Sequence, residues 1–133
     1  MEIRSAVLDA ILEHALQELP VECCGLLVGS SLRIECAVRA RNTVASPTRY
    51  EVDPVGHFAA IRRARADGLR VVGAYHSHPK GPPIPSETDL AKVTYTDYLY
   101  LIVSPAGGRV GTECFGVYCL EQDRFERISL AVI

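Results

Sequence analysis

Residues 69–79 read LRVVGAYHSHP, and this stretch predicts both the centre of the fold and its chemistry. The nearly continuous apolar run up to Tyr75 is typical of a central strand that is covered on both faces. In a strand, residues i and i+2 point to the same face about 6.5–7 Å apart, so two imidazoles can converge on one ion. His76 and His78 are therefore candidate metal ligands at the end of this strand. Taken alone, the pair also fits two polar residues where a strand meets solvent.

The residues that follow supply a candidate third ligand. Four prolines lie between His78 and Ser86, and they reduce the entropy that is lost when this loop is ordered. Ser86-x-x-Asp89 is typical of a capping box at the start of a helix. A carboxylate in a first helical turn can also point towards a metal, so the two roles of Asp89 are compatible. Two histidines and one aspartate would leave one position of a tetrahedral zinc site open, as in catalytic sites.

The first forty residues predict a helix followed by a hairpin. Ile3, Val7 and Ile11 form one apolar stripe at spacing four, which predicts a helix that Pro20 ends. The short apolar run 24–29 and the alternating apolar residues of 32–38 predict two paired strands.

The remaining elements complete a mixed sheet. A second helix is expected to begin at Asp53-Pro54, to turn Phe58, Ile61 and Ala64 inward, and to stop at Gly68. A third helix is expected from Ser86. Strands are expected within 98–103, 110–120 and 125–132. This order of elements predicts an α/β fold in which helices flank a mixed central sheet, not a regular series of βαβ units.

Length and composition are those of one compact domain. The chain has 133 residues, of which 48% are hydrophobic, and its formal net charge is -2. No internal repeat or linker indicates a second domain, so we expect a single domain over residues 1–133. No apolar run approaches the ~20 residues of a membrane span, and no signal-peptide pattern opens the chain. The near-neutral charge is unlike that of a nucleic-acid binder. We therefore expect a cytoplasmic protein with neither membrane nor nucleic acid as its main partner.

Several other residues that can bind metals are expected to be structural. The five cysteines form no CxxC pair, and their odd number favours reduced thiols over disulfides. Cys23 and Cys24 are adjacent, so in a strand they would face opposite ways, which argues against both binding one metal. His14 and His57 lie on predicted helices without partners at metal-ligand spacing, and we expect them to be surface or cap residues.

Glu22 is the candidate general base. It stands just before the predicted strand 24–29. Metal-assisted amide hydrolysis needs a group that takes the proton of the attacking water and passes it to the leaving amine, and a carboxylate does this in zinc peptidases. An isolated glutamate of this kind would otherwise be a solvated surface residue.

These motifs together resemble those of the JAMM (MPN+, Mov34) metalloprotease family. His76, His78, Ser86 and Asp89 match the pattern H-x-H-x7-S-x2-D, and residues 22–29 (ECCGLLVG) resemble the upstream glutamate motif of the family. Asn42 and the segment 50–54 look like the part of the family that leads into its second helix. The resemblance covers nearly the whole chain, and it implies an MPN-type domain with a cytidine-deaminase-like layout.

The same resemblance implies a role for each site residue. His76, His78 and Asp89 would bind Zn²⁺, and Glu22 would be the general acid/base. Ser86 would help to stabilise the tetrahedral oxyanion. Because every motif position is present, the chain is similar to the catalytically competent members.

A substrate class also follows from the resemblance. Family members that cut ubiquitin conjugates carry insertions after the metal-binding segment, and there is almost no room for one between Asp89 and the strand expected near Tyr98. The chain therefore looks like the minimal bacterial or archaeal members. Several of these cut after the C-terminal Gly-Gly of small ubiquitin-like sulfur carrier proteins, for example to release cysteine. We expect such a carrier as the partner.

Three alternative functions remain. Zinc nucleoside deaminases also place a glutamate near a metal-binding histidine, but their H-x-E and P-C-x-x-C patterns are not present. A zinc-bound MPN-type module could hold a partner without cutting it, and such a module should tolerate the loss of Glu22 and Ser86. A peptidase for other ubiquitin-like conjugates or for short peptides would carry the same motifs.

Overall fold

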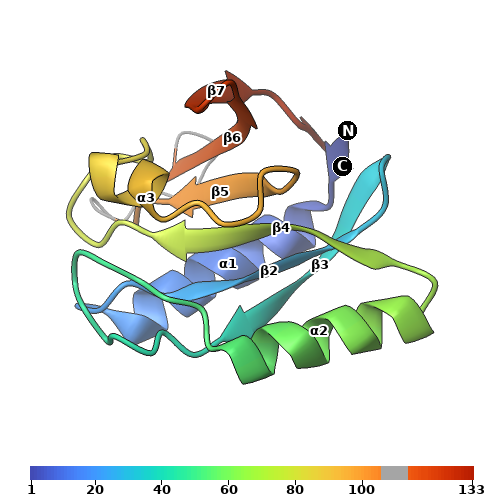
Figure 1. Ribbon diagram of the computed structural model, residues 1–133, viewed down its shortest axis with the longest axis horizontal. Coiled ribbons are helices and arrows are strands. Elements are labelled where there is room, and N and C mark those ends of the chain that lie inside the picture. Colours follow the sequence, from blue (N-terminus) through green and yellow to red (C-terminus); the bar gives the residue numbers. More distant parts are fainter. Residues whose placement is uncertain (106–113) are drawn as a thin grey trace.

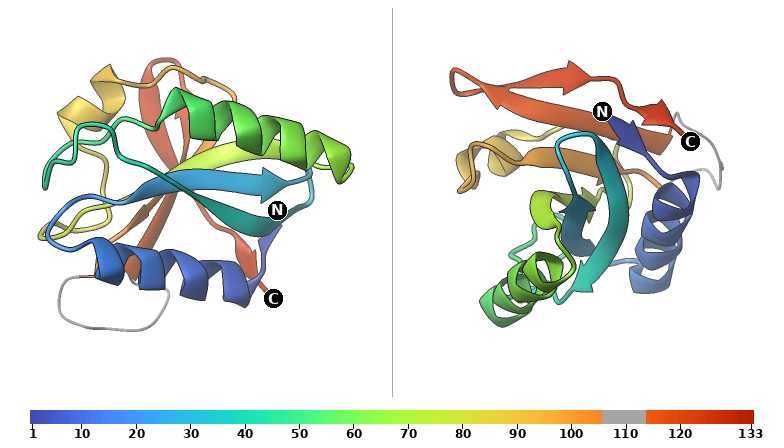
Figure 2. Two further views of the ribbon diagram at one scale, coloured as in Figure 1. Left: turned by 90° about the horizontal axis from the view of Figure 1, so that it is seen from below. Right: turned by 90° about the vertical axis from the view of Figure 1, so that its right-hand side faces the viewer.

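The computed structural model describes residues 1–105 and 114–133. Within these ranges, eight strands form one curled, mixed sheet with the order β7-β6-β5-β4-β2-β3-β1-β8. The strands are β1 (Glu2–Ile3), β2 (Cys24–Gly29), β3 (Arg33–Ala40), β4 (Arg70–Ser77), β5 (Leu99–Val103), β6 (Phe115–Glu121), β7 (Arg124–Ile128) and β8 (Ala131–Val132). The helices are α1 (Ser5–Glu18), α2 (Pro54–Ala66) and α3 (Glu87–Ala91). α1 and α2 cover opposite faces of the sheet (Figure 2), which confirms the predicted α/β architecture.

β4 is the central strand that the apolar run predicted (Figure 1). It lies between β2, which is antiparallel to it, and β5, which is parallel. Every residue of β2 is buried, as is every residue of β4 after Arg70. Leu27 and Tyr75 belong to the core beneath α1, whereas Leu26 and Ala74 belong to the core beneath α2. Successive side chains of β2 and β4 therefore point alternately to the α1 side and to the α2 side of the sheet.

The two ends of the chain lie side by side, each in a short strand (Figure 1). The apolar periodicity of the sequence did not distinguish the first of these strands from α1 or the last from β7. Ile3 is not helical: it pairs with Ile34 of β3 and with Val132 of β8. The predicted helix therefore began too early. Ile3 is apolar and lies four positions before Val7, so it fits the helical spacing although it belongs to a strand. The predicted strand 125–132 is divided into β7 and β8, which form the two edges of the sheet. Residues 110–113 of the strand predicted at 110–120 lie outside the described residues.

α2 begins and ends as its signals predicted. The carboxylate of Asp53 caps the helix by accepting a hydrogen bond of 3.0 Å from the N–H of Val55. Beyond its last turn, Gly68 has φ of 73°, a left-handed conformation that favours glycine at a helix C-terminus. In the part of the chain that the structure describes, no helix is long and apolar enough to cross a membrane.

The inward face of α2 differs from the prediction at one position. Ala64 is buried as expected and Ile61 is partly buried, but Phe58 is 62% exposed. The sheet is covered instead by Ala60 together with Ala64. These two small residues lie one turn apart, so α2 can approach the sheet closely, and the larger aromatic ring is turned to the surface.

The prediction that His14 is a surface or cap residue was wrong. Its exposure is 2%, and its Nδ1 lies 2.8 Å from the hydroxyl of Tyr75 within the core beneath α1. This hydrogen bond gives the buried imidazole a polar partner. The helix pattern alone did not indicate that such a partner exists. His57 is half-buried, and its Nε2 lies 2.9 Å from the hydroxyl of Tyr98.

Candidate metal centre

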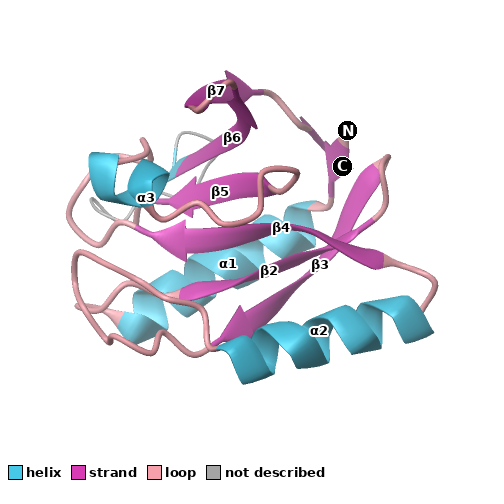
Figure 3. Ribbon diagram, in the orientation of Figure 1, coloured by secondary structure: helices cyan, strands magenta, loops and turns pink. Residues whose placement is uncertain are grey.

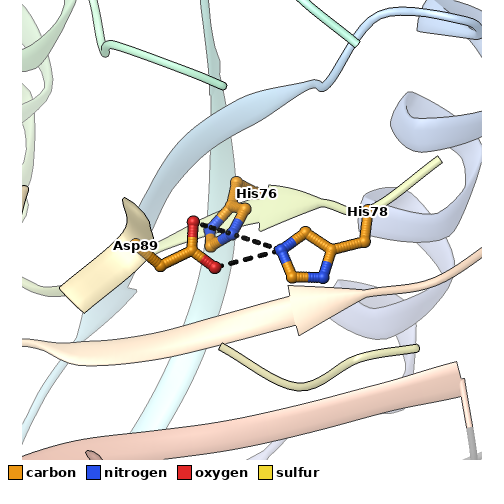
Figure 4. Close-up of side chains that lie close together, drawn as sticks. All are labelled: His76, His78 and Asp89. Atoms are coloured by element: carbon orange, nitrogen blue, oxygen red, sulfur yellow. Dashed lines mark hydrogen bonds and ion pairs between the residues drawn. The ribbon is translucent and has the colours of Figure 1, made fainter. Parts of the chain in front are cut away.

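The three predicted ligands meet at the end of β4 (Figure 4). His76 is the next-to-last residue of β4, His78 directly follows the strand, and Asp89 comes from the first turn of α3. The Nε2 atom of His76 is 3.2 Å from Nε2 of His78 and 3.2 Å from Oδ1 of Asp89. The Nε2 atom of His78 is 3.0 Å from Oδ2 of Asp89. Among the described residues, these are the side chains grouped closely enough to share one metal ion, and Cys23 and Cys24 are not among them.

The spacing of these atoms fits a single Zn²⁺ ion. Zn–N and Zn–O bonds of about 2.0–2.1 Å at tetrahedral angles separate neighbouring ligand atoms by about 3.3 Å. The three observed separations are 3.0 to 3.2 Å. The side chains of His76 and Asp89 are only 3% and 8% exposed, so little water competes for these atoms. The donor set has the composition and spacing of a catalytic zinc site with one open position.

Contacts outside the cluster orient the two imidazoles. The Nδ1 atom of His78 lies 2.9 Å from the carbonyl of Pro82, to which it can only donate, so in the neutral ring the lone pair is on Nε2. The ring of His76 stacks on Tyr50, with centroids 4.2 Å apart and planes 19° from parallel. Within the described part of the chain, Nδ1 of His76 has no hydrogen-bond partner. Stacking therefore orients this ring.

The protonation states of His76 and Asp89 favour metal binding. Burial lowers the pKa of His76, which keeps this imidazole neutral. Burial would raise the pKa of Asp89, but its hydrogen bonds with His76 and His78 hold that pKa well below its usual range. A neutral imidazole and an ionised carboxylate are the forms that coordinate a cation. Burial lowers the pKa of His78, but its hydrogen bonds to Asp89 and to the carbonyl of Pro82 raise that pKa overall, so a metal ion would displace a proton from this ring.

Glu22 is brought beside this cluster by the pairing of β2 with β4. Cys24 pairs with His76, and the same register carried two residues further places Glu22 across from His78. Glu22 is only 3% exposed, so it is not a solvated surface residue. Its Oε1 has no hydrogen-bond partner among the described residues. Burial raises the pKa of Glu22 to about 7, a value suited to a group that takes up and releases a proton near neutral pH.

The raised pKa predicts that Glu22→Gln stabilises the metal-free protein at high pH. The folded protein holds the Glu22 proton more tightly than the unfolded chain, whose glutamate titrates near 4.5. The free energy of unfolding is therefore unaffected by this group below that pH, and it falls as the pH rises towards 7. We expect Glu22→Gln to be more stable than the wild type by about 2–3 kcal/mol at pH ~8, with almost no difference at pH ~4.

Urea unfolding of both proteins at the two pH values, after chelation of metal, measures this difference. A difference that does not depend on pH would contradict the raised pKa. Because both proteins share all other titrating groups, the comparison isolates the carboxyl of Glu22.

Ser86 and Asp89 form the predicted capping box at the start of α3. The Oγ atom of Ser86 accepts from the N–H of Asp89 at 3.0 Å, and Oδ2 of Asp89 accepts from the N–H of Ser86 at 2.9 Å. The capping and ligand geometries of Asp89 are thus present together. The bond to Ser86 uses its oxygen as an acceptor, so its hydroxyl proton can still be donated to another group.

Two residues that hold the site were given no role by the sequence. The amide nitrogen of Asn42 donates to the carbonyls of Glu22 and Arg49, both at 3.0 Å, and its oxygen accepts from the N–H groups of Val44 and Glu51. Asn42 therefore fixes the backbone of Glu22 to the loop that carries Tyr50. Tyr50 itself orients His76. The resemblance of Asn42 and of the segment 50–54 to the family was the only signal for these two residues, and it did not indicate these contacts.

A cleft of about 510 Å³ lies beside the ligands. Tyr50 connects the cleft with the metal centre, because it lines the cleft and also stacks on His76. The lining includes Ala74 of the sheet and the rings of Tyr95 and Tyr98, which stack with centroids 4.5 Å apart. The described lining of the cleft does not include His76, His78 or Asp89, so Tyr50 is the residue that connects the cleft with the metal centre.

The sequence is similar to those of known peptidases. The family described as prokaryotic homologs of the JAB domain matches residues 4–117. A desampylase from Haloferax volcanii is 37% identical over 131 residues, which span 93% of this chain and 90% of the relative. A CysO-cysteine peptidase from Mycobacterium tuberculosis is 37% identical over 105 residues, which span 77% of this chain and 71% of the relative.

The fold is similar to solved structures over the whole chain. A protein from Desulfitobacterium hafniense has a TM-score of 0.88 at 27% identity, with 100% of this chain and 93% of that chain covered. A JAB1/MPN domain protein from Archaeoglobus fulgidus has a TM-score of 0.67 at 25% identity, with 100% of this chain and 99% of that chain covered. Fold and sequence therefore agree with the resemblance that the motifs indicated.

Proposed function

The chain belongs to the prokaryotic JAB-domain family of JAMM zinc peptidases, and on this premise we propose that it hydrolyses the bond after the C-terminal Gly-Gly of a small ubiquitin-like protein. The observation that carries the proposal is the convergence of two imidazoles and one carboxylate, with atoms 3.0 to 3.2 Å apart, beside the buried carboxyl of Glu22. A metal site and a nearby general base are the two parts that metal-assisted amide hydrolysis needs.

Each site residue has a role in this proposal. His76, His78 and Asp89 would hold Zn²⁺, which would supply a Lewis acid for the attacking water and for the scissile carbonyl. Glu22 accepts the proton of the attacking water and returns it to the leaving amine, a role that its buried position beside the cluster allows. The hydroxyl of Ser86 donates to the oxygen of the carbonyl as negative charge develops on it.

The proposed substrate is a small ubiquitin-like sulfur carrier, cut at its tail. Relatives named desampylase and CysO-cysteine peptidase support this class. Only residues 92–98 separate α3 from β5, so there is no large insertion after the metal-ligand segment. The cleft that Tyr50 connects with the metal centre would take part of an extended tail, and glycines without side chains would allow its backbone to approach the ligands closely.

The proposal is tested by the intact mass of a carrier that is extended by one cysteine after Gly-Gly. We expect the wild type to remove the cysteine residue and the Glu22→Gln variant to leave the carrier unchanged. If neither protein changes the mass while zinc is bound, this substrate class is wrong. Cleavage by both proteins would contradict the role of Glu22.

A tail whose backbone must approach the ligands closely predicts a strict requirement for glycine. Replacement of the penultimate glycine of the carrier by leucine should lower turnover on the order of 100-fold, which is the effect of a displacement of about 1 Å at the reacting bond. The rate of cysteine release measures this effect. A leucine placed far from the tail on the same carrier is the control, and equal rates for the two carriers would argue against a narrow channel.

A further inference from the structure

We propose that Tyr118 and Ser104 are positioning residues of the metal centre, which act through the backbone of the loop between His78 and Ser86. This inference rests on the ligands assigned above. The loop joins β4 to α3 (Figure 3), and three of its consecutive carbonyls each accept a hydrogen bond from a different side chain. Ser104 donates to the carbonyl of Gly81 at 2.5 Å, His78 to that of Pro82 at 2.9 Å, and Tyr118 to that of Pro83 at 2.7 Å.

The composition of the loop explains why side chains supply these donors. Residues 79, 82, 83 and 85 are prolines, which have no N–H, so the loop can make few backbone hydrogen bonds of its own. The carbonyl groups still need partners where they pack against the sheet. Tyr118 lies in β6 and Ser104 directly follows β5, so one donor comes from the sheet and the other from the residue that adjoins it.

The fit between β6 and the loop is close. A side chain at Gly116 would collide with the carbonyl of Pro83 and with the ring of Tyr118. The other contacts of the Tyr118 ring are the guanidinium of Arg127, 5.9 Å from its centroid, and the ring of Phe125. Tyr118 is 5% exposed, so its hydroxyl is held against the loop rather than in water.

Two ligands depend on the position of this loop. The carbonyl of Pro82 sets the tautomer of His78 and points its Nε2 towards the cluster. The loop then leads into Ser86, whose N–H holds the carboxylate of Asp89. Fixing the carbonyls on both sides of Pro82 therefore preorganises a ligand at each end of the loop. Loss of an outer-shell partner of this kind typically weakens metal binding by 10- to 100-fold.

The test measures metal binding by the full chain, not activity. Tyr118→Phe removes only the hydroxyl, and we expect it to bind Zn²⁺ and Co²⁺ about tenfold more weakly than the wild type in a chelator competition. The visible absorption of the Co²⁺ protein should also change, because the orientation of His78 and Asp89 affects the ligand field. Ser104→Ala should change both measurements in the same direction, and it serves as the test if Tyr118→Phe does not fold.

Tyr100→Phe is the matched control for metal affinity. Tyr100 pairs with Tyr118 across β5 and β6, and it also donates to a backbone carbonyl, that of Tyr95 at 2.6 Å, away from the loop. We expect its metal affinity and Co²⁺ absorption to equal those of the wild type. Wild-type values in Tyr118→Phe, or an equal loss in Tyr100→Phe, would overturn the inference. A wild type that binds no metal would instead contradict the assigned ligands.

Discussion

Replacing Glu22 by glutamine is expected to lower kcat for tail cleavage by about 10²- to 10⁴-fold while zinc stays bound. Glutamine has nearly the same size and keeps the buried position, but its amide cannot accept the proton of the attacking water. The expected loss is that of one general acid/base. Because Glu22 is not among the grouped metal ligands, the zinc content should not fall with the activity.

The rate of cysteine release and the zinc content per chain are measured on the same preparation. Glu13→Gln is the matched control, since Glu13 is an exposed carboxylate of α1 that bonds to Gln17 on the same helix. This control should keep both the wild-type rate and its zinc. Full activity of Glu22→Gln with zinc bound would show that another group is the base.

Asp89→Asn should cause the largest change in metal binding, a loss of Zn²⁺ affinity greater than about 100-fold. The loss should exceed that for an outer-shell partner, because asparagine removes the anionic ligand itself. Activity at limiting zinc should disappear with the metal. Asparagine can still accept the hydrogen bond from the N–H of Ser86, so much of the helix cap should remain.

Two controls separate the roles of this carboxylate, with Zn²⁺ affinity measured by chelator competition. Asp67→Asn alters an exposed carboxylate that is paired with Arg63 on α2, and its zinc affinity should be that of the wild type. Ser86→Ala removes the other half of the capping box, at a cost of about 1 kcal/mol in stability, and should retain zinc. Loss of zinc from Ser86→Ala equal to that from Asp89→Asn would indicate that the cap, and not ligation, decides metal binding.

Local patterns in the sequence were sufficient for the elements that carry the ligands. The apolar run before His76 determined a strand buried on both faces, because such a run can be satisfied only between two layers. Ser86 and Asp89 determined the start of α3 through a capping box that involves only four consecutive residues. Two local features were enough to predict that these ligands could share one ion. They are the i, i+2 spacing of His76 and His78 and the short loop that joins β4 to α3.

The tertiary structure decided the environments of the side chains. The burial of Glu22, and with it the raised pKa, results from the register of β2 on β4 and from Asn42, which lies 20 residues away in the chain. His14 was expected at the surface, but the hydroxyl of Tyr75, 61 residues away, gives it a partner in the core. Phe58 was expected inside, but the small residues of α2 cover the sheet.

The same division applies to the loop between His78 and Ser86. Its prolines indicated an ordered loop, but Ser104 and Tyr118, which bond to its carbonyls, come from strands that follow it in the sequence. The sequence by itself therefore determined which groups can bind zinc and which elements carry them, because those signals are local. Only the tertiary structure decided how these groups are oriented and how strongly they hold protons, since both depend on neighbours that are distant in the chain.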